Sequence, residues 1–154
     1  MSQVAIGIRA FTNGFSYVAL SGTQSNPKIE SYERYSFPSG NQDPQNLSWL
    51  RKQLAEVVER VAPTCACIKM IEPVSRKKSP GRIRVEAVVL EYLYTSLGIV
   101  CSERIKAQLR RDIQDFDDPA RYLEKVLSDS DTLDTLNHAS FQEATLTAIA
   151  ELPA

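Results

Sequence analysis

Apolar and polar residues alternate along the first part of the chain. Residues 4–8 place a β-branched apolar side chain at every second position, a period of two that predicts a β-strand. Asn13-Gly14 then favours a tight hairpin turn, and residues 15–20 continue with strand-forming side chains. A third strand is predicted at residues 29–36. The chain therefore opens with a three-stranded antiparallel meander.

The apolar spacing changes to three and four residues after position 43. Asp43 before Pro44 is typical of a helix N-cap followed by a proline in the first turn. Apolar residues then recur on one helical face, at Leu47, Leu50, Leu54, Val57 and Val61. Pro63 ends this helix. The next run, residues 64–71, is almost continuously apolar, which predicts a central strand buried on both faces.

Helix and strand patterns alternate in the rest of the chain. A second helix is predicted at residues 83–97, with Gly98 just after its end, and a short strand at residues 99–101. Three further helices are predicted: one from Ser102 to about residue 112, one capped by Asp118 and running to residue 127, and one that opens with a capping box between Ser140 and Glu143.

This order of elements predicts an α/β fold. Two strand-helix-strand crossovers follow the meander, and right-handed crossovers place their strands parallel to the first strand. The expected sheet order is 3-2-1-4-5, with strand 2 antiparallel and helices on both faces. This is the plan of the RNase H-like superfamily, and one domain spanning residues 1–154 is expected.

Composition agrees with such a domain. The 154 residues are 43% apolar and 24% charged, so a core can form without a metal or disulfide. Cys65, Cys67 and Cys101 lie in strand-like runs and are expected to be reduced core thiols, and His138 is too isolated to suggest zinc. No apolar run approaches the roughly 18 residues of a membrane span, so no membrane contact and a cytoplasmic location are expected.

Charge is unevenly distributed along the chain. The net charge is only -1, yet residues 69–111 contain ten basic and four acidic residues, whereas residues 112–154 contain two basic and ten acidic ones. The two stretches either pair in the folded protein or leave the basic one free for a polyanion.

Four segments together carry a family resemblance. They are Val4-Ala5-Ile6-Gly7-Ile8 with its hairpin, Ala66-Cys67-Ile68-Lys69 before a basic loop, Arg84-Val85-Glu86-Ala87 at a helix start, and Ser140-Phe141-Gln142-Glu143-Ala144. The sequence resembles a small family of uncharacterised bacterial proteins with an RNase H-like fold, distantly similar to the RuvC resolvases. The resemblance implies a nuclease site with acids on the first strand, the fourth strand and a late helix, around Mg²⁺.

The chain departs from that pattern at two positions. Arg9 stands where the RuvC-like first strand has aspartate, and Lys69 stands at the aligned position of the fourth strand. A guanidinium cannot ligate Mg²⁺ and stays protonated at any working pH. We therefore expect these two residues to disrupt the site, and we expect no metal and no cofactor.

Other acids offer a rearranged set. Glu72 follows the fourth strand, Glu143 matches the late-helix acid, and Glu86 or Asp112 would complete the set. Each also has a structural interpretation: Glu72 as a solvated acid at a strand end, Glu143 as the N3 residue of the capping box, and Glu86 as a helix residue directed away from the sheet. The structural interpretations are favoured.

The connection between the fourth strand and the second helix is strongly basic. Its candidate nucleic-acid-binding residues are Arg76, Lys77, Lys78, Arg82 and Arg84, and Lys106, Arg110 and Arg111 extend them along the next helix. A loop that is solvated or neutralised by the acidic third of the chain is the alternative.

These observations favour a catalytically degenerate RNase H-like domain that acts as a binding or scaffolding module, with a homodimer through its helical face as one assembly. Two alternatives stay open. One is a Mg²⁺-dependent RuvC-like nuclease using the rearranged acids, and the other is a non-catalytic protein that binds nucleic acid through residues 76–84.

Overall fold

The computed structural model describes residues 3–128 and 131–154. Within these ranges, five strands form one sheet in the order β3-β2-β1-β4-β5, as the sequence predicted. The strands are β1 (Ala5–Phe11), β2 (Gly14–Gly22), β3 (Pro27–Ser36), β4 (Cys65–Lys69) and β5 (Ser102–Arg104). The helices are α1 (Asp43–Val61), α2 (Pro80–Leu97), α3 (Lys106–Asp112), α4 (Pro119–Val126), α5 (Leu133–Leu136) and α6 (Gln142–Ala150).

The sheet is mixed, and β1 is its central strand. It pairs antiparallel with β2 on one side and parallel with β4 on the other, and β4 in turn pairs parallel with β5. The antiparallel meander and both crossovers are thereby confirmed. Because β1 and β4 are parallel neighbours, their carboxyl ends lie at the same edge of the sheet.

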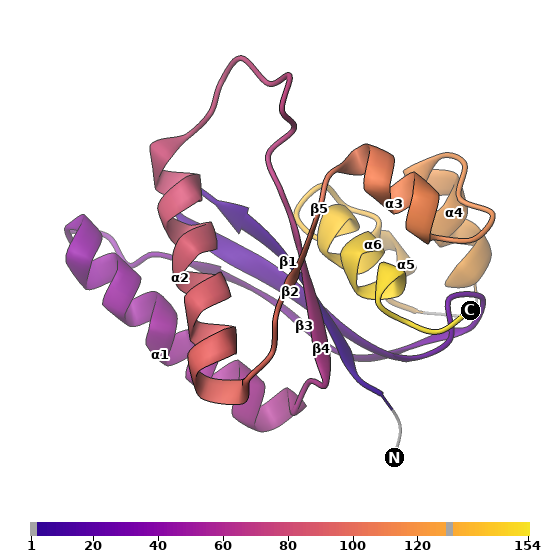
Figure 1. Ribbon diagram of the computed structural model, residues 1–154, viewed down its shortest axis with the longest axis horizontal. Helices are drawn as coiled ribbons and strands as arrows, with labels where there is room; N and C mark the ends of the chain where they lie inside the picture. The colour runs from indigo at the N-terminus through magenta and orange to yellow at the C-terminus, as the bar shows by residue number, and fades with distance from the viewer. Residues whose placement is uncertain (1–2, 129–130) are drawn as a thin grey trace.

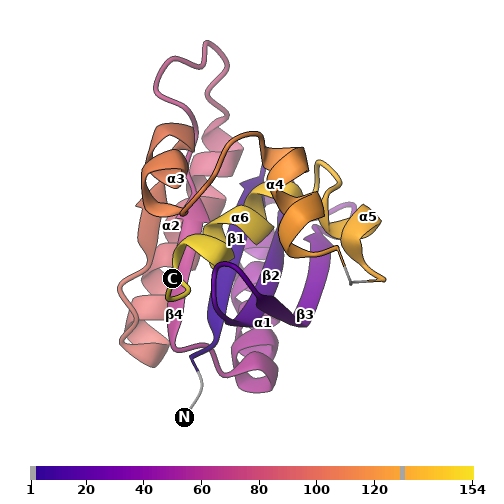
Figure 2. The same ribbon diagram turned by 90° about the vertical axis from the view of Figure 1, so that its right-hand side faces the viewer.

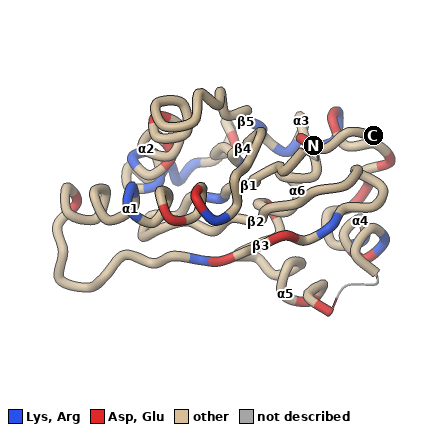
Figure 3. Tube along the Cα trace, turned by 90° about the horizontal axis from the view of Figure 1, so that it is seen from below, with Lys and Arg blue, Asp and Glu red and all other residues tan. Residues whose placement is uncertain are grey.

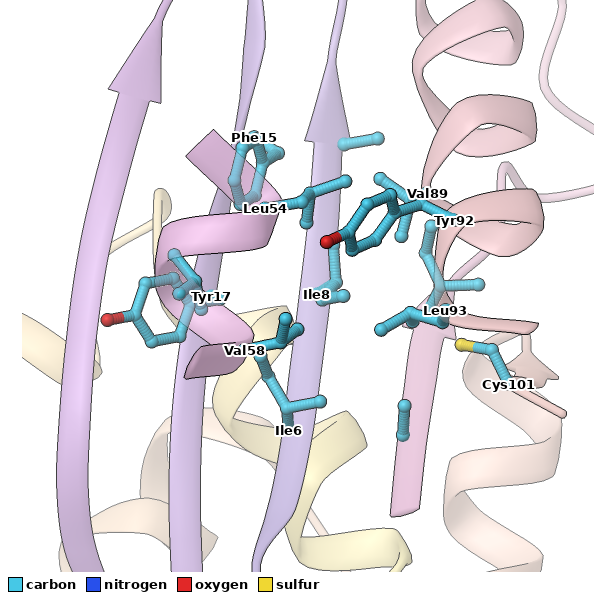
Figure 4. Packing of buried hydrophobic residues seen from close by; sticks show 14 of the residues in the cluster. Ile6, Ile8, Phe15, Tyr17, Leu54, Val58, Val89, Tyr92, Leu93 and Cys101 are labelled. Carbon is cyan, nitrogen blue, oxygen red and sulfur yellow. The ribbon is translucent and has the colours of Figure 1, made fainter. Parts of the chain in front are cut away.

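One face of the sheet is covered by α1 and α2 (Figure 1). Ile6 and Ile8 of β1 point into this layer and pack with Leu54 of α1 and Val89 of α2, all fully buried (Figure 4). The apolar spacing of three and four residues in α1 is the cause, since it places Leu50, Leu54 and Val57 on the buried side.

The other face is covered by α6, with α3 and α4 beside it, and α6 crosses directly over β1 (Figure 2). Gly7 makes this close approach possible. A Cβ atom built at Gly7 would lie 1.9 Å from the carbonyl oxygen of Ala144 and 2.5 Å from the backbone nitrogen of Ala148. The first turns of α6 therefore rest on the backbone of β1.

The fifth strand and third helix differ from the prediction. We expected a strand at residues 99–101 and a helix capped by Ser102, but β5 begins at Ser102 and α3 begins at Lys106. Residues 98–101 form the C-terminal cap of α2 and the connection that follows it. Gly98 adopts φ +68°, and the Ile99 N–H donates to the Leu93 carbonyl. Pairing with β4 then starts at Ser102, opposite Cys67.

Other boundaries also move. β4 is shorter than the predicted 64–71, and α2 begins at Pro80 rather than residue 83 because Ser79 caps it by accepting from the Arg82 N–H at 3.2 Å. The N-cap of α1 is Gln42 rather than Asp43, which is the first helical residue.

The cysteines behave as predicted. Cys67 and Cys101 are buried, Cys65 is partly buried, and all three are free thiols. Burial raises the pKa of Cys67 to about 12, so this thiol stays protonated at neutral pH. No helix in the described ranges has both the length and the apolar character that a membrane span requires.

Candidate functional site at the carboxyl ends of β1 and β4

A cleft of about 360 Å³ opens where β1 and β4 end. The end of β1, the end of β4, the following connection and the start of α6 all contribute to it. Its lining has four basic side chains but only two acidic ones, and consists of Arg9, Phe11, Thr12, Lys69, Ile71, Glu72, Ser75, Lys77, Ser79, Arg82 and Glu143. The cleft is therefore cationic, whereas the chain as a whole is not.

Arg9 and Lys69 reach the same carboxylate. Strand alternation turns both side chains toward α6, on the side of Gly7 and away from the core that holds Ile8. There Arg9 Nε lies 2.7 Å from Glu143 Oε1, and Lys69 Nζ lies 3.2 Å from Glu143 Oε2. Burial alone would raise the pKa of Glu143, but the charges of Lys69 and Arg9 outweigh it and lower that pKa.

This arrangement corrects the predicted role of Glu143. The N-cap of α6 is Phe141, and no side chain caps the helix, so Ser140 and Glu143 do not form a capping box. Glu143 is drawn to the sheet because two cations there offer stronger charge-assisted hydrogen bonds than a backbone N–H does. Ser140 instead accepts a hydrogen bond from Arg34 at 2.6 Å.

Lys69 is almost completely buried. Its side chain is 5% exposed, and Nζ donates to the Met70 carbonyl at 2.8 Å besides meeting Glu143. Glu72 is 3.8 Å from the same Nζ and accepts from the Lys106 N–H at 3.1 Å, so it also caps the first turn of α3. The acid that follows β4 is thus partnered rather than merely solvated.

Arg82 closes the cleft on the α2 side. Its Nη2 donates to the Lys69 carbonyl at 2.9 Å, and its Nε lies 3.9 Å from Glu86 Oε1. Burial lowers the pKa of Arg82, and the nearby charge of Arg9 adds to the effect. Glu86 was expected to point away from the sheet, but the residue is buried, at 4% exposed, with its carboxylate beside Arg82.

The residues present do not fit a divalent cation. Each candidate acid near the cleft lies beside a basic side chain: Glu143 beside Arg9 and Lys69, Glu72 beside Lys69, and Glu86 beside Arg82. Asp112 does not line the cleft and pairs with Arg104 at 2.8 Å. Among the described residues, no three His, Cys, Asp or Glu side chains gather as metal ligands.

The basic loop projects from the body of the protein between β4 and α2 (Figure 1). Arg76, Lys77 and Lys78 are exposed on it, and Lys77 also lines the cleft. Arg84 is exposed but pairs with Asp43 at 2.9 Å. Of the five basic residues singled out from the sequence, Lys77 and Arg82 are therefore the two that the fold brings to the cleft.

Part of the expected pairing between basic and acidic stretches is present. Arg104 of β5 bonds to Asp112 at 2.8 Å and Glu151 at 2.6 Å, and Lys69 pairs with Glu143. On α4, basic and acidic positions lie next to one another, and α5 has an acidic one (Figure 3). The exposed lysines of the loop are outside this pairing.

Sequence reasoning missed the hydroxyl side of the cleft. Thr12 and Ser79 lie 2.7 Å apart between their oxygens, and the start of α2 follows directly. The Ser79-Pro80 pair is a recognisable helix start, so this end of α2 was within reach of the sequence. Thr12 gave no such signal, because only the β1–β2 hairpin places it there.

We expect Lys69→Met to lower the free energy of unfolding by about 2 kcal/mol at neutral pH, because it removes a buried cation and leaves Glu143 with Arg9 alone. The loss should shrink as the pH falls below the ordinary carboxyl range, since protonated Glu143 no longer attracts Lys69. Urea unfolding at neutral pH and at a pH below the carboxyl range measures this loss of stability. Arg51→Met is the control, because the Arg51–Glu91 pair is about half exposed on both sides. Equal losses in the two variants would contradict this view of Lys69.

Comparison with solved structures identifies the class of fold. RuvC of Thermus thermophilus, in complex with a Holliday junction substrate, superposes with a TM-score of 0.76 at 11% sequence identity, covering 96% of this chain and 91% of that one. The fowlpox virus resolvase, in complex with Holliday junction DNA, superposes with a TM-score of 0.60 at 10% identity, covering 96% and 97%. The protein has the RNase H-like fold.

The structures on which it superposes are those of Holliday junction resolvases, RuvC and the poxvirus enzyme. The fold resemblance drawn from the sequence is thereby confirmed. No protein-family model matches the chain, and no curated protein matches it either. At 10–11% identity the likeness concerns the fold, and the chemistry of the cleft depends on its own side chains.

Proposed function

We propose that this protein is a catalytically inactive RNase H-like domain that binds nucleic acid in the cationic cleft and along the basic loop. The observation that supports it most is the ion-pair cluster of Arg9, Glu143 and Lys69, which puts two cations where a nuclease of this fold needs oxygen ligands. That cluster argues against metal-dependent catalysis, and the further cations of the cleft, Lys77 and Arg82, are natural partners for phosphate oxygens.

The surroundings of the cluster favour an anionic strand. Lys77 and Arg82 line the same cleft, the hydroxyls of Thr12 and Ser79 lie at its edge, and α2 directs its positive N-terminal end toward it. The resolvases with this fold were solved with Holliday junctions bound. A branched DNA is therefore the first ligand to test.

The binding test uses a fluorescent four-way junction at low salt. We expect saturable binding that weakens as salt rises, and we expect Lys77→Ala with Lys78→Ala to lower the slope of log affinity against log salt by about 2. Lys28→Ala with Lys52→Ala is the control, since both lysines are exposed but outside the cleft. Equal slopes in the two double variants would contradict the proposed surface, and absence of binding at low salt would refute the function.

The same samples distinguish binding from catalysis. We expect the junction to stay intact in Mg²⁺ or Mn²⁺. Metal-dependent cleavage that Glu72→Gln or Glu143→Gln abolishes would instead favour the rearranged-acid nuclease.

A homodimer through the helical face stays a prediction. Tyr94, Leu97 and Val100 are exposed at the end of α2, and exposed apolar surface of this kind is typical of protein contacts.

A further inference from the structure

A second pocket, of about 290 Å³, opens next to the cationic cleft. It lies between the exit of β4 and the first turns of α2. Its walls are apolar, with Lys78 and Glu86 as its charged members, and they comprise Met70, Ile71, Lys78, Ile83, Ala87, Leu90 and Glu86. Ile71 lines both this pocket and the cleft, so the two are adjacent.

Glu86 is the unusual member of this lining. Its side chain is 5% exposed, and its Oε2 atom has no hydrogen-bond partner among the residues that the structure describes. Its Oε1 atom is 3.9 Å from Arg82 Nε, which is an ion pair but is too long for a hydrogen bond. The Arg82 Nε atom also has no hydrogen-bond partner among the described residues. The charge of Arg82 offsets part of the cost of burying this carboxylate, but a buried oxygen without a hydrogen-bond donor is still costly, which favours a ligand that supplies one.

The charges around Glu86 define what kind of donor fits. Arg82 is beside it, Lys78 shares the pocket, and the charges of Arg9 and Lys69 also reach it. The negative charge of Glu103 opposes them but is outnumbered by these four basic groups. A further cation would be repelled by these four. A neutral group with N–H donors on a flat apolar body avoids that repulsion and fills the pocket between Ile83 and Leu90.

A nucleobase meets both conditions. Of the four DNA bases, guanine presents two adjacent donors, N1–H and the N2 amino group, which match the two oxygens of a carboxylate. Recognition of an unstacked base by its Watson–Crick edge between apolar side chains is an established mode of binding. The neighbouring cleft would hold the phosphates on either side.

We propose that the pocket at Glu86 binds one unpaired guanine of the nucleic acid, whose backbone lies in the adjacent cleft. The inference rests on the proposed function and adds to it a base preference. Because pairing must be broken for the base to enter, single strands and unpaired positions are the preferred ligands.

The test compares single-stranded oligothymidines that differ at one central position: guanine, inosine, adenine or an abasic site. Affinity is measured by fluorescence anisotropy at low salt. We expect the guanine strand to bind about tenfold more tightly than the adenine strand, with inosine, which lacks the N2 amino group, in between. The four ligands probe the pocket in the unaltered protein, so the result does not depend on any variant folding.

Glu86→Gln supplies the matching change in the protein. Glutamine offers one acceptor and one donor, so this variant should bind guanine and adenine strands alike while keeping the affinity for the abasic strand. Glu91→Gln is the control, because Glu91 lies on the same helix but is exposed and paired with Arg51. It should leave the guanine preference unchanged.

The outcomes separate the two proposals. If no strand binds at low salt, the proposed function fails and this inference fails with it. If strands bind without a guanine preference, or if the preference survives in Glu86→Gln, the pocket is not a base site while the function stands. A dimer is the other possible occupant of the pocket. If Leu90→Asp dissociates a dimer and no base preference exists, a second copy of the chain covers the pocket and the base site is refuted.

Discussion

Arg9→Asp combined with Lys69→Glu is expected to create a Mg²⁺ site at the carboxyl ends of β1 and β4. The change brings two new carboxylates to the strand ends, where Glu143 already lies within 3.2 Å of both replaced side chains. Three hard oxygen donors then face one another, which is the donor set that Mg²⁺ prefers. It also removes a repulsion between a divalent ion and a cation about 4 Å away, worth about 8 kcal/mol at an effective dielectric of 20.

Calorimetric titration measures this gain. We expect no detectable heat of Mg²⁺ binding for the natural protein and a saturable isotherm for the double variant. Lys28→Asp with Lys52→Glu is the matched control, because it changes the net charge equally at two exposed positions away from the cleft. Saturable binding by the natural protein, or equal binding by the control, would overturn the view that Arg9 and Lys69 exclude the metal.

Gly7→Ala is expected to cost more than about 3 kcal/mol of folding free energy, above the usual range for overpacking. The added methyl group would lie 1.9 Å from the Ala144 carbonyl oxygen and 2.5 Å from the Ala148 nitrogen. Both are backbone atoms, so no rotamer change relieves the clash, and α6 must move off β1. Thermal or urea unfolding measures the loss.

Gly40→Ala provides the comparison for Gly7. Gly40 has φ +85°, and nothing lies within 4 Å of a Cβ atom built there, so only backbone strain of about 1 kcal/mol is expected. A Gly7→Ala variant no less stable than Gly40→Ala would show that α6 does not rest on β1 as described. Because Glu143 lies in the first turn of this helix, a displaced α6 should also weaken binding to the four-way junction.

Local patterns were sufficient for most of the architecture. The alternation at residues 4–8 and the spacing of Leu50, Leu54 and Val57 each record which face of an element is buried. The hairpin was also predicted, but its turn lies one residue earlier than Asn13-Gly14: Phe11 pairs with Gly14, so Thr12 and Asn13 form the turn and Gly14 begins β2. Burial periodicity and turn chemistry are properties of neighbouring residues, so they are readable without the fold. The sheet order followed from the element order and the handedness of crossovers.

The same reasoning failed where a residue serves a distant partner. Ser140 and Glu143 fit a capping box locally, yet Glu143 pairs with residues that lie 134 and 74 positions away in the chain. The fifth strand was misplaced because its start is set by pairing with Cys67 rather than by its own three residues. Glu86 was expected to point outward but is buried. Its burial depends on Arg82 and the exit of β4, which the spacing of α2 does not reveal.

The chain by itself determined the elements, their order and the presence of Arg9 and Lys69 at the ends of two adjacent strands. Only the tertiary structure decided that these cations share one carboxylate, that Gly7 admits α6 against the sheet, and that Glu86 lies buried beside a pocket. The reason is physical: side-chain periodicity is fixed over a few residues, whereas the field and the free space around a charge come from segments that meet only after folding.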